Sequence, residues 1–217
     1  MILLAALVAL DFTGAEIKST GEFSARPKLE GSAQIEVQPD GRRALLMDGK
    51  GCLVLPGTET LDVSDGATFE ATVKFLRPSR IGGKDEIFDG ILFKDGQFLL
   101  GRTRDALYFN FCRDGKWVAK ANNPPIPCGR WTHLAVTLAK GEKDYTVRYY
   151  VDGAFVYRTQ VPFGAASPSP KPLLVGQCWG AQWRLRGLVA SVAVHRGARD
   201  EAGIAKLFGQ SPFAGEK

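Results

Sequence analysis

The sequence predicts an all-β fold, an antiparallel two-sheet β-sandwich with one short C-terminal helix. Three observations support this fold class: many short segments carry an apolar residue at every second position, glycines and prolines are spread along the chain, and Asp-Gly pairs separate apolar stretches. With 217 residues and 45% hydrophobic content, the chain can bury one core. We expect a single sandwich domain over residues 7–209, followed by a tail over residues 210–217.

The strands follow from period-two alternation of apolar and polar residues. The clearest example is Thr68–Phe75, and a second run follows Trp131. The same pattern predicts strands over Leu7–Phe12, Ala44–Met47, Ile87–Phe93, Gln97–Gly101, Leu107–Cys112, Lys116–Lys120, Thr146–Val151, Phe155–Gln160, Leu173–Gln177 and Arg186–His195.

Turn and cap residues mark the ends of these segments. Asp95–Gly96, Asp114–Gly115 and Asp152–Gly153 lie between apolar stretches, and Asp-Gly readily takes the positive φ of a hairpin turn, so three hairpins are predicted. One helix is predicted over Asp200–Phe208, because Asp200 can cap it and its apolar residues share one face.

The N-terminus and the charge limit the function classes. Residues 1–6 fit either a remnant of a secretion signal or the start of the first strand, and the apolar start is too short for a transmembrane segment. Twenty-eight basic against 23 acidic residues give a net charge of +5, which favours polyanionic ligands. Since no motif that reads nucleic acid accompanies this charge, we expect acidic glycans rather than nucleic acid.

Four cysteines leave two interpretations open. Cys52, Cys112, Cys128 and Cys178 lack the close pairing of zinc sites, so we expect no metal knuckle. Their even number would allow two disulfides, with Cys112–Cys128 favoured because the segment between them resembles a hairpin. Four buried free thiols are the alternative.

Several segments in order along the chain resemble one family. They are Ala44–Gly49 followed by Leu53–Pro56, Ala67–Phe75, Trp131–Thr137, Tyr150–Gly153, Leu174–Gly176, Leu185–Val189 and the helix over 201–208. Together they resemble the laminin G-like, concanavalin A-like lectin-glucanase jelly-roll superfamily. The resemblance implies a jelly roll that binds glycans or proteins through one sheet or its rim loops, in a secreted or cell-envelope protein.

The same resemblance bears on cofactors. Many relatives carry an acidic pair that can hold a structural calcium ion where this chain has Ala190 and Ser191. A hard cation needs several oxygen ligands, and carboxylates supply the charge, so calcium is disfavoured and we expect no cofactor.

Catalytic chemistry finds little support in the acidic and imidazole residues. A glycosidase needs paired carboxylates, whereas Glu70 stands among Thr and Lys, and Glu86 and Asp89 fall on opposite faces of a strand. We interpret all three as solvated surface residues. His133 and His195 lie far apart in sequence, and neither is expected to act in catalysis or to bind a metal.

Aromatic and amide side chains provide the candidate binding site, because sugar rings stack on flat side chains and their hydroxyls need planar polar partners. Tyr108 and Asn110 share one strand face, expected to be wet, and Trp117 lies on the next strand. A glycine-containing loop adds Gln177, Trp179, Gln182, Trp183 and Arg184. The competing interpretation is that Trp179 and Trp183 are half-buried packing at the rim.

Two further assignments concern a tryptophan and three arginines outside this candidate site. We expect Trp131 in the core. Arg102, Arg104 and Arg113 either add a site for a carboxylate or sulfate or form a solvated basic edge that discourages aggregation.

The sequence therefore predicts a non-catalytic carbohydrate-recognition module. A protein-interaction or adhesion module of the same fold is the alternative, and it would show a broad flat apolar patch instead of a groove of sugar width. A cryptic glycoside hydrolase or polysaccharide lyase is the third option, and it would require two titratable groups within reach of one ligand.

Overall fold

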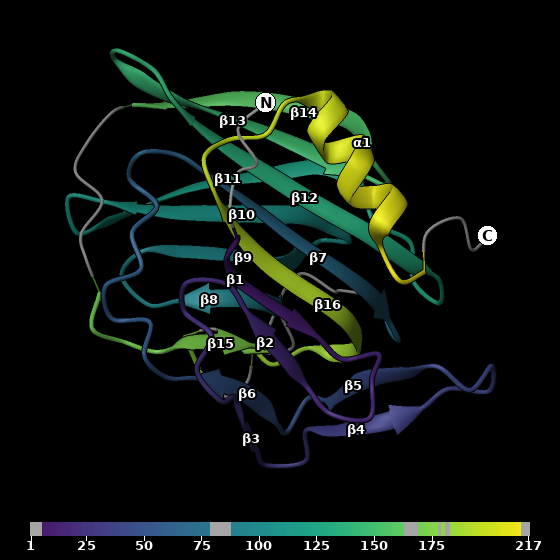
Figure 1. Ribbon diagram of the computed structural model, residues 1–217. Coiled ribbons are helices and arrows are strands. Elements are labelled where there is room, and N and C mark those ends of the chain that lie inside the picture. The colour runs from purple at the N-terminus through teal and green to yellow at the C-terminus, as the bar shows by residue number, and fades with distance from the viewer. Residues whose placement is uncertain (1–5, 79–87, 163–168, 178, 181–182, 214–217) are drawn as a thin grey trace.

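The chain folds as a sandwich of two antiparallel β-sheets with one helix near the C-terminus (Figure 1). The computed structural model describes residues 6–78, 88–162, 169–177, 179–180 and 183–213. The predicted fold class, an all-β jelly-roll sandwich with one short C-terminal helix, is confirmed.

The first sheet has nine strands and is built around the long strand β16. Its main order is β14 (Ala154–Pro162), β13 (Asp144–Val151), β12 (Trp131–Lys140), β7 (Ala67–Phe75), β16 (Arg186–Arg196), β1 (Ala6–Asp11) and β2 (Lys18–Thr20). Strand β5 (Arg43–Asp48) pairs with the first part of β16, and β4 (Gln34–Val37) pairs with β5. β16 therefore has β7 along one side, and β5 and then β1 along the other.

The second sheet has seven strands and forms the other layer. Its order is β11 (Lys116–Pro125), β10 (Ala106–Arg113), β9 (Phe98–Thr103), β8 (Phe88–Lys94), β15 (Leu173–Val175), β6 (Cys52–Leu55) and β3 (Lys28–Glu30). All strand pairs within it are antiparallel.

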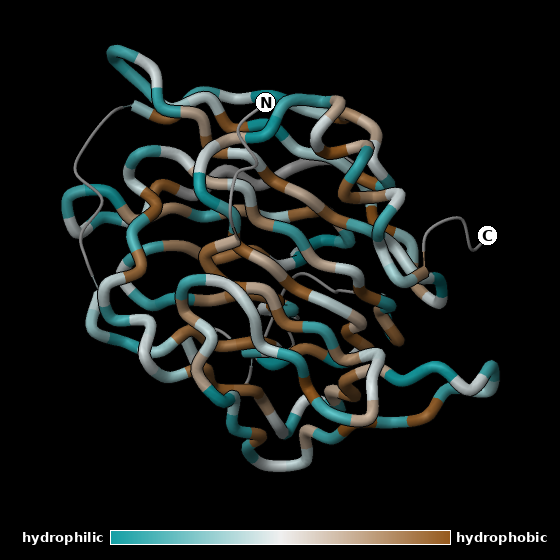
Figure 2. Tube along the Cα trace, in the orientation of Figure 1, coloured by the Kyte–Doolittle hydropathy of each residue, from teal (hydrophilic) through white to brown (hydrophobic). Residues whose placement is uncertain are grey.

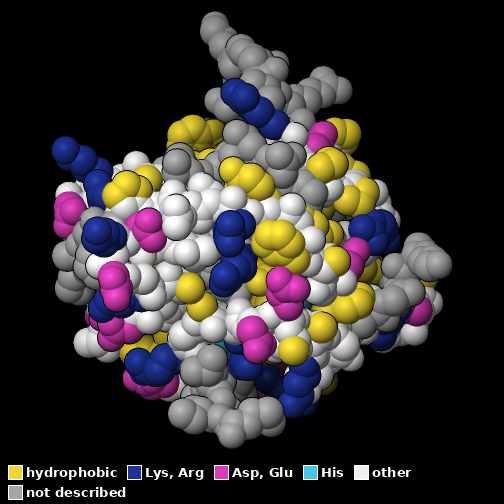
Figure 3. Space-filling model, turned by 90° about the horizontal axis from the view of Figure 1, so that it is seen from above, with side chains coloured by type: hydrophobic (Ala, Val, Ile, Leu, Met, Phe, Trp, Pro, Cys, Tyr) yellow, Lys and Arg dark blue, Asp and Glu magenta, His cyan; other side chains and the backbone are white. Residues whose placement is uncertain are grey.

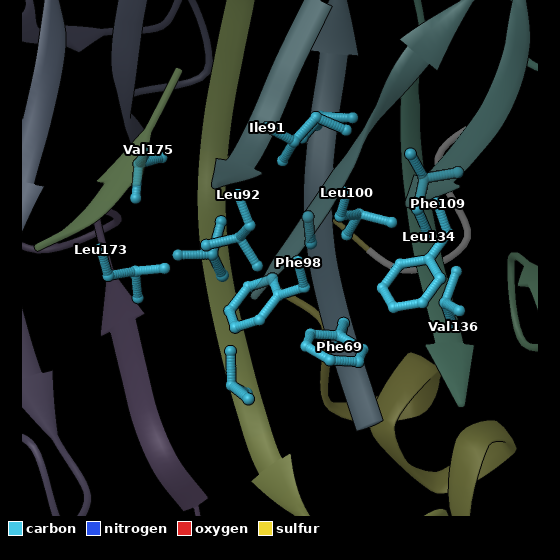
Figure 4. Close-up of a cluster of buried hydrophobic side chains, with 14 of the residues drawn as sticks. Phe69, Ile91, Leu92, Phe98, Leu100, Phe109, Leu134, Val136, Leu173 and Val175 are labelled. Atoms are coloured by element: carbon cyan, nitrogen blue, oxygen red, sulfur yellow. The ribbon is translucent and has the colours of Figure 1, made fainter. Parts of the chain in front are cut away.

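The core lies between the two sheets, where their inward side chains interdigitate (Figure 4). Phe69 of the nine-stranded sheet is central, because its ring centroid lies 4.7 Å from that of Phe98 and 5.0 Å from that of Phe109 on the opposite sheet. Hydrophobic and hydrophilic residues alternate along many strands (Figure 2). The period-two pattern of the sequence thus produces one shared interior.

The hairpin turns follow the predicted chemistry, with one difference in detail. Both residues of Asp114–Gly115 and of Asp152–Gly153 have positive φ, as a two-residue turn requires. The β8–β9 hairpin instead closes with three residues, and only Gly96 among them has positive φ. A fourth tight hairpin joins β9 to β10 through Arg104 and Asp105, at φ of 54° and 51°. It was not predicted, because it contains no glycine.

Helix α1 (Glu201–Gln210) covers part of the outer face of the nine-stranded sheet (Figure 1). The Asp200 side chain caps it by accepting a hydrogen bond from the Gly203 backbone N–H at 2.8 Å. Ile204 is buried against Ala135 and Tyr150 of the sheet, which docks the helix. Among the described residues, no helix is long and apolar enough to cross a membrane.

The strands predicted from alternation are present, and four short ones were not predicted from it: β2, β3, β4 and β6, the last of which overlaps the family-like segment Leu53–Pro56 and is buried almost throughout. Strands β2, β3 and β4 contain three or four mostly exposed residues each. Their lack of a buried face removes the alternation on which the prediction depends.

The predicted Cys112–Cys128 disulfide is wrong, because both side chains are free thiols, as is that of Cys52. Cys112 pairs with Trp117 beside the turn of the β10–β11 hairpin, whereas Cys128 follows the far end of β11. The hairpin does connect them, but it places them at opposite ends. Cys178 lies outside the described residues.

Candidate functional site

Six aromatic side chains gather on the outer face of the seven-stranded sheet, and we call this surface the aromatic face. Its members come from β8, β10, β11 and the loop after β15: Phe88, Phe93, Tyr108, Trp117, Trp179 and Trp183. The structure thus brings together four side chains that the sequence assigned to the binding site.

Strand alternation determines which side chains reach this face. In β10, Leu107 and Phe109 point into the core, so Tyr108 points outward, and its ring lies edge-on to Phe88 with centroids 4.9 Å apart. In β11, Trp117 lies opposite Cys112 on the outward side and stacks on Phe93 at 6.1 Å.

Gly101 of β9 allows the Phe88 ring to lie close to the backbone of the sheet. A Cβ atom at this position would lie 2.6 Å from the Asp89 carbonyl oxygen and 2.9 Å from Cε1 of Phe88. Both distances are shorter than side-chain contacts allow, so only glycine fits below the ring.

Trp179 is the centre of the aromatic face. Its ring centroid lies 5.3 Å from Trp117, 5.7 Å from Trp183, 5.9 Å from Phe93 and 6.0 Å from Phe88. It nevertheless remains 40% exposed, whereas Trp117 and Trp183 are half-buried. The tryptophan is therefore held by four neighbouring rings and still presents part of its surface to solvent.

Polar contacts fix the base of the loop that carries Trp179 and Trp183. Gln177 and Arg184 form a backbone bridge, and Arg184 Nε donates to Gln177 Oε1 at 2.7 Å. Arg184 Nη1 also donates to the Lys50 carbonyl at 2.5 Å. Gly176 begins the loop at φ 81° with Met47 packed against it, so a Cβ would collide with that side chain.

Asn110 differs from its prediction, because it is 2% exposed and not wet. Its Nδ2 donates to the Tyr108 hydroxyl at 3.0 Å, and its Oδ1 has no partner within the described part of the chain. Alternation places this side chain on the outward face of its strand but could not reveal that it is buried there. Gln182, also predicted for the site, lies outside the described residues.

Residues 48–205 match the family model described as the concanavalin A-like lectin/glucanases superfamily. The chain belongs to this superfamily. No curated protein sequence matches it.

Solved structures share the fold of this concanavalin A-like domain. The binding domain of Paraclostridial Mosquitocidal Protein 1 is 11% identical with a TM-score of 0.75, over 95% of this chain and 52% of that one. Domain 4 of AbnA, an extracellular arabinanase from Geobacillus stearothermophilus solved with arabinotriose, is 17% identical with a TM-score of 0.69, over 94% and 98%. The binding domain of botulinum neurotoxin DC, solved with SialylT, is 12% identical with a TM-score of 0.69, over 94% and 51%. The chain spans about half the length of the toxin domains.

Arg102 of β9 and Asp89 of β8 form a buried ion pair in the seven-stranded sheet of this concanavalin A-like domain. The pair corrects the expectations for both residues. Arg102 Nη2 donates to Asp89 Oδ2 at 2.8 Å, and both side chains are 0% exposed. Arg102 is therefore not available to a ligand, and Asp89 is not a solvated surface residue. Burial raises the pKa of Asp89 although Arg102 and Arg77 act in the opposite direction.

Glu70 is not a solvated surface residue either, because it bridges the two histidines. Nε2 of His133 lies 3.1 Å from Oε2 of Glu70, and Nε2 of His195 lies 2.7 Å from Oε1. Burial alone raises the pKa of Glu70, but the hydrogen bonds from both histidines outweigh it and lower the pKa to about 2.

The cluster of Glu70 with the two histidines was not predicted, because the three residues lie far apart in the sequence. Glu70 pairs with Ala135 on β12 and Ala193 on β16; His133 lies two residues before the first and His195 two residues after the second. Such diagonal neighbours are within reach across a sheet, but they can be found only once the strand order is known. Among the described residues, no three His, Cys, Asp or Glu side chains are arranged to hold a metal ion.

Trp131 is buried, at 6% exposure, but outside the main core. Its ring stacks on Phe213 with centroids 3.9 Å apart, on the outer face of the nine-stranded sheet. The residue is therefore covered by the segment that follows α1, and not by the second sheet.

Proposed function

We propose that residues 7–209 form a non-catalytic carbohydrate-recognition module whose ligand binds on the aromatic face. The observation that carries this proposal is the exposure of Trp179, 40% despite four aromatic neighbours. Sugar rings carry apolar C–H faces that stack on such a surface, and a rigidly held ring loses little entropy on binding.

The polar residues beside Trp179 suit the hydroxyl groups of a sugar. Gln177 and Arg184 bond to each other at the base of the loop, and the half-buried Tyr108 is held by the buried Asn110, which is itself not open to a ligand. Planar amide and guanidinium groups fixed by mutual bonds provide directional hydrogen bonding. The complexes of two structural relatives with arabinotriose and SialylT agree with this class of ligand.

Acidic glycans are the finer proposal, and it rests on charge. The chain carries a net charge of +5, and Arg184 lies at the base of the aromatic loop. The face seen in Figure 3 mixes basic and acidic side chains, so the excess charge is not gathered there. We further propose a secreted or cell-envelope location, in keeping with the extracellular enzyme to which one structural relative belongs.

The proposal of a non-catalytic role rests on the burial of Asp89 in the sheet below this face. Asp89, the carboxylate in β8, is bonded to Arg102 and fully buried. It therefore cannot approach a glycosidic bond on the outer side of the sheet as an acid or nucleophile would have to do.

A glycan array that pairs sulfated and uronic-acid glycans with their neutral counterparts tests the proposal, followed by calorimetry on each ligand found. The variant is the double change Trp179→Ala, Trp183→Ala, and the control is Phe155→Ala, which removes a 45% exposed aromatic ring from β14. We expect the double change to weaken binding at least about tenfold and the control to leave it unchanged. Binding that survives the double change would remove the proposed site, and an array without any ligand would favour the protein-interaction alternative.

A further inference from the structure

A cavity lies on the outer face of the nine-stranded sheet, on the side of the sandwich opposite the aromatic face. It has a volume of about 360 Å³ and is bounded by β1, β2, β7, β12, β16 and the end of α1, which Figure 1 shows close together. Small side chains such as Ala9, Thr72, Ser191 and Ala193 help to leave the space open. At ~30 Å³ per water, the cavity has room for about a dozen non-hydrogen atoms, the size of one sugar ring.

The floor of this cavity holds a preorganised carboxylate. Glu70 lines it and accepts one hydrogen bond on each oxygen, from His133 and from His195. A carboxylate offers about four lone-pair sites, so further acceptor capacity remains. Arg199 Nη2 lies 3.3 Å from Nδ1 of His195, an arrangement that keeps the proton of this imidazole on Nε2, toward Glu70.

His133 adds an independent sign that the site is built for a ligand. Its side chain is 2% exposed and lines the cavity, and its Nδ1 has no hydrogen-bond partner among the described residues. A buried polar atom without a partner is costly, and such atoms are concentrated at functional positions.

The charges around the cavity define the class of ligand. Two carboxylates, Glu70 and Asp11, line it together with one basic side chain, the exposed Lys18 at its rim. Thr72 and Ser211 contribute hydroxyl groups that already bond to each other at 2.8 Å. The lining is therefore rich in acceptors and has more carboxylates than basic side chains, with Arg199 bonded to His195 from outside the lining, and this disfavours anions and favours a cation that brings hydrogen-bond donors.

We propose that this cavity is a second binding site, for a small molecule of monosaccharide size that carries a protonated amine, with Glu70 as its counter-charge. The two histidines position Glu70 and keep its charge directed into the cavity. The site is independent of glycan binding at the aromatic face.

The probe is D-glucosamine, and N-acetyl-D-glucosamine is the matched ligand, since it keeps the ring and removes the charge. Amide ¹H–¹⁵N NMR spectra at pH 6.5 locate each probe. We expect glucosamine to shift the amides of Thr72, Ser191 and Ala193, and the acetylated sugar to leave them in place. Shifts confined to the region of Tyr108 and Leu99 would place the probe on the aromatic face and overturn the proposal.

Variants at the exposed Gln210, which lines the cavity from the end of α1, test the charge without disturbing the sheet. Gln210→Lys should weaken glucosamine binding about tenfold, and Gln210→Glu should tighten it, because each places a charge at the entrance. Glu70→Gln, which keeps the shape of the side chain, should also weaken binding at least about tenfold. Equal binding of the two sugars, indifference to both Gln210 variants, or no shifts at the highest probe concentration would each overturn the proposal.

Discussion

The buried ion pair between Asp89 and Arg102 supports the sheet below the aromatic face. Asp89 Oδ2 accepts hydrogen bonds from Arg102 Nε at 3.2 Å and from Nη2 at 2.8 Å. The Arg102 guanidinium also lies over the Phe75 ring, 3.9 Å from its centroid. The change Asp89→Asn keeps the shape of the side chain and removes its charge, so it tests how much of the fold depends on this pair.

The expected loss can be worked from the surroundings of Arg102. Breaking a buried pair by removing one partner costs about 3–5 kcal/mol, because the other charge stays buried. Asp105 Oδ1 lies 3.4 Å from Arg102 Nη1 and is 41% exposed, so part of the counter-charge remains. We therefore expect Asp89→Asn to lower the free energy of unfolding by about 3 kcal/mol.

The double change Asp89→Leu, Arg102→Met separates the charge effect from packing. Burial raises the pKa of Asp89 even beside two arginines, which shows that desolvation outweighs attraction for its ionised form. Replacing both charges with apolar side chains of similar size should thus cost less than Asp89→Asn alone.

Urea unfolding followed by far-UV circular dichroism at pH 7, with a reductant for the free thiols, measures all of these variants. A free energy of unfolding for Asp89→Asn within about 0.5 kcal/mol of the wild-type value would show that the fold does not depend on this ion pair. A double change that lowers the free energy of unfolding as much as Asp89→Asn does would equally contradict the role given to the unpaired charge.

Three further changes test the fold around the two sites. Glu70→Gln should lower the free energy of unfolding by about 3 kcal/mol at pH 7, since the carboxyl pKa falls from 4.5 to about 2 on folding. As the pH is lowered through this range, the wild type should lose this stability and the variant should not. The same change of unfolding free energy with pH in both proteins would contradict this prediction. Lys94→Met should cost about 1–2 kcal/mol in the same assay, because the buried ammonium donates to two backbone carbonyls at 2.6 and 3.0 Å; an unchanged midpoint would show that water replaces it. Gly101→Ala should cost about 1–3 kcal/mol and change the near-UV aromatic spectrum, because the new methyl group displaces Phe88; a native spectrum would show that the ring does not lie over this glycine.

The sequence was sufficient to predict the sandwich because burial on one side leaves an alternating pattern. Phe69, Val73 and Leu134 are fully buried where alternation placed them, and the Asp-Gly pairs at 114 and 152 form the expected turns. Strands without a buried face, such as β4, leave no such pattern. The turn through Arg104 and Asp105 was missed because it contains no glycine and begins with an arginine, a residue that seldom adopts positive φ.

The candidate site was predicted in part, because residue type is visible in a sequence and coverage by distant segments is not. Tyr108, Trp117, Trp179 and Trp183 meet as expected, but Asn110 is covered and Arg102 is neutralised by Asp89 from the neighbouring strand. The association of Glu70 with two histidines 63 and 125 residues away depends on which strands are neighbours. Strand order in a sheet with crossovers cannot be inferred from local alternation.

The central claim, that a glycan binds on the aromatic face, can be tested most directly by ¹⁹F NMR on protein labelled with 5-fluorotryptophan. The chain contains four tryptophans. Trp131 serves as an internal control because it is buried against Phe213 on the outer face of the nine-stranded sheet, away from the aromatic face. On titration with a glycan found by the array, we predict the largest shift for Trp179, smaller shifts for Trp117 and Trp183, and none for Trp131. A glycan that binds while the Trp179 resonance stays in place would contradict the account.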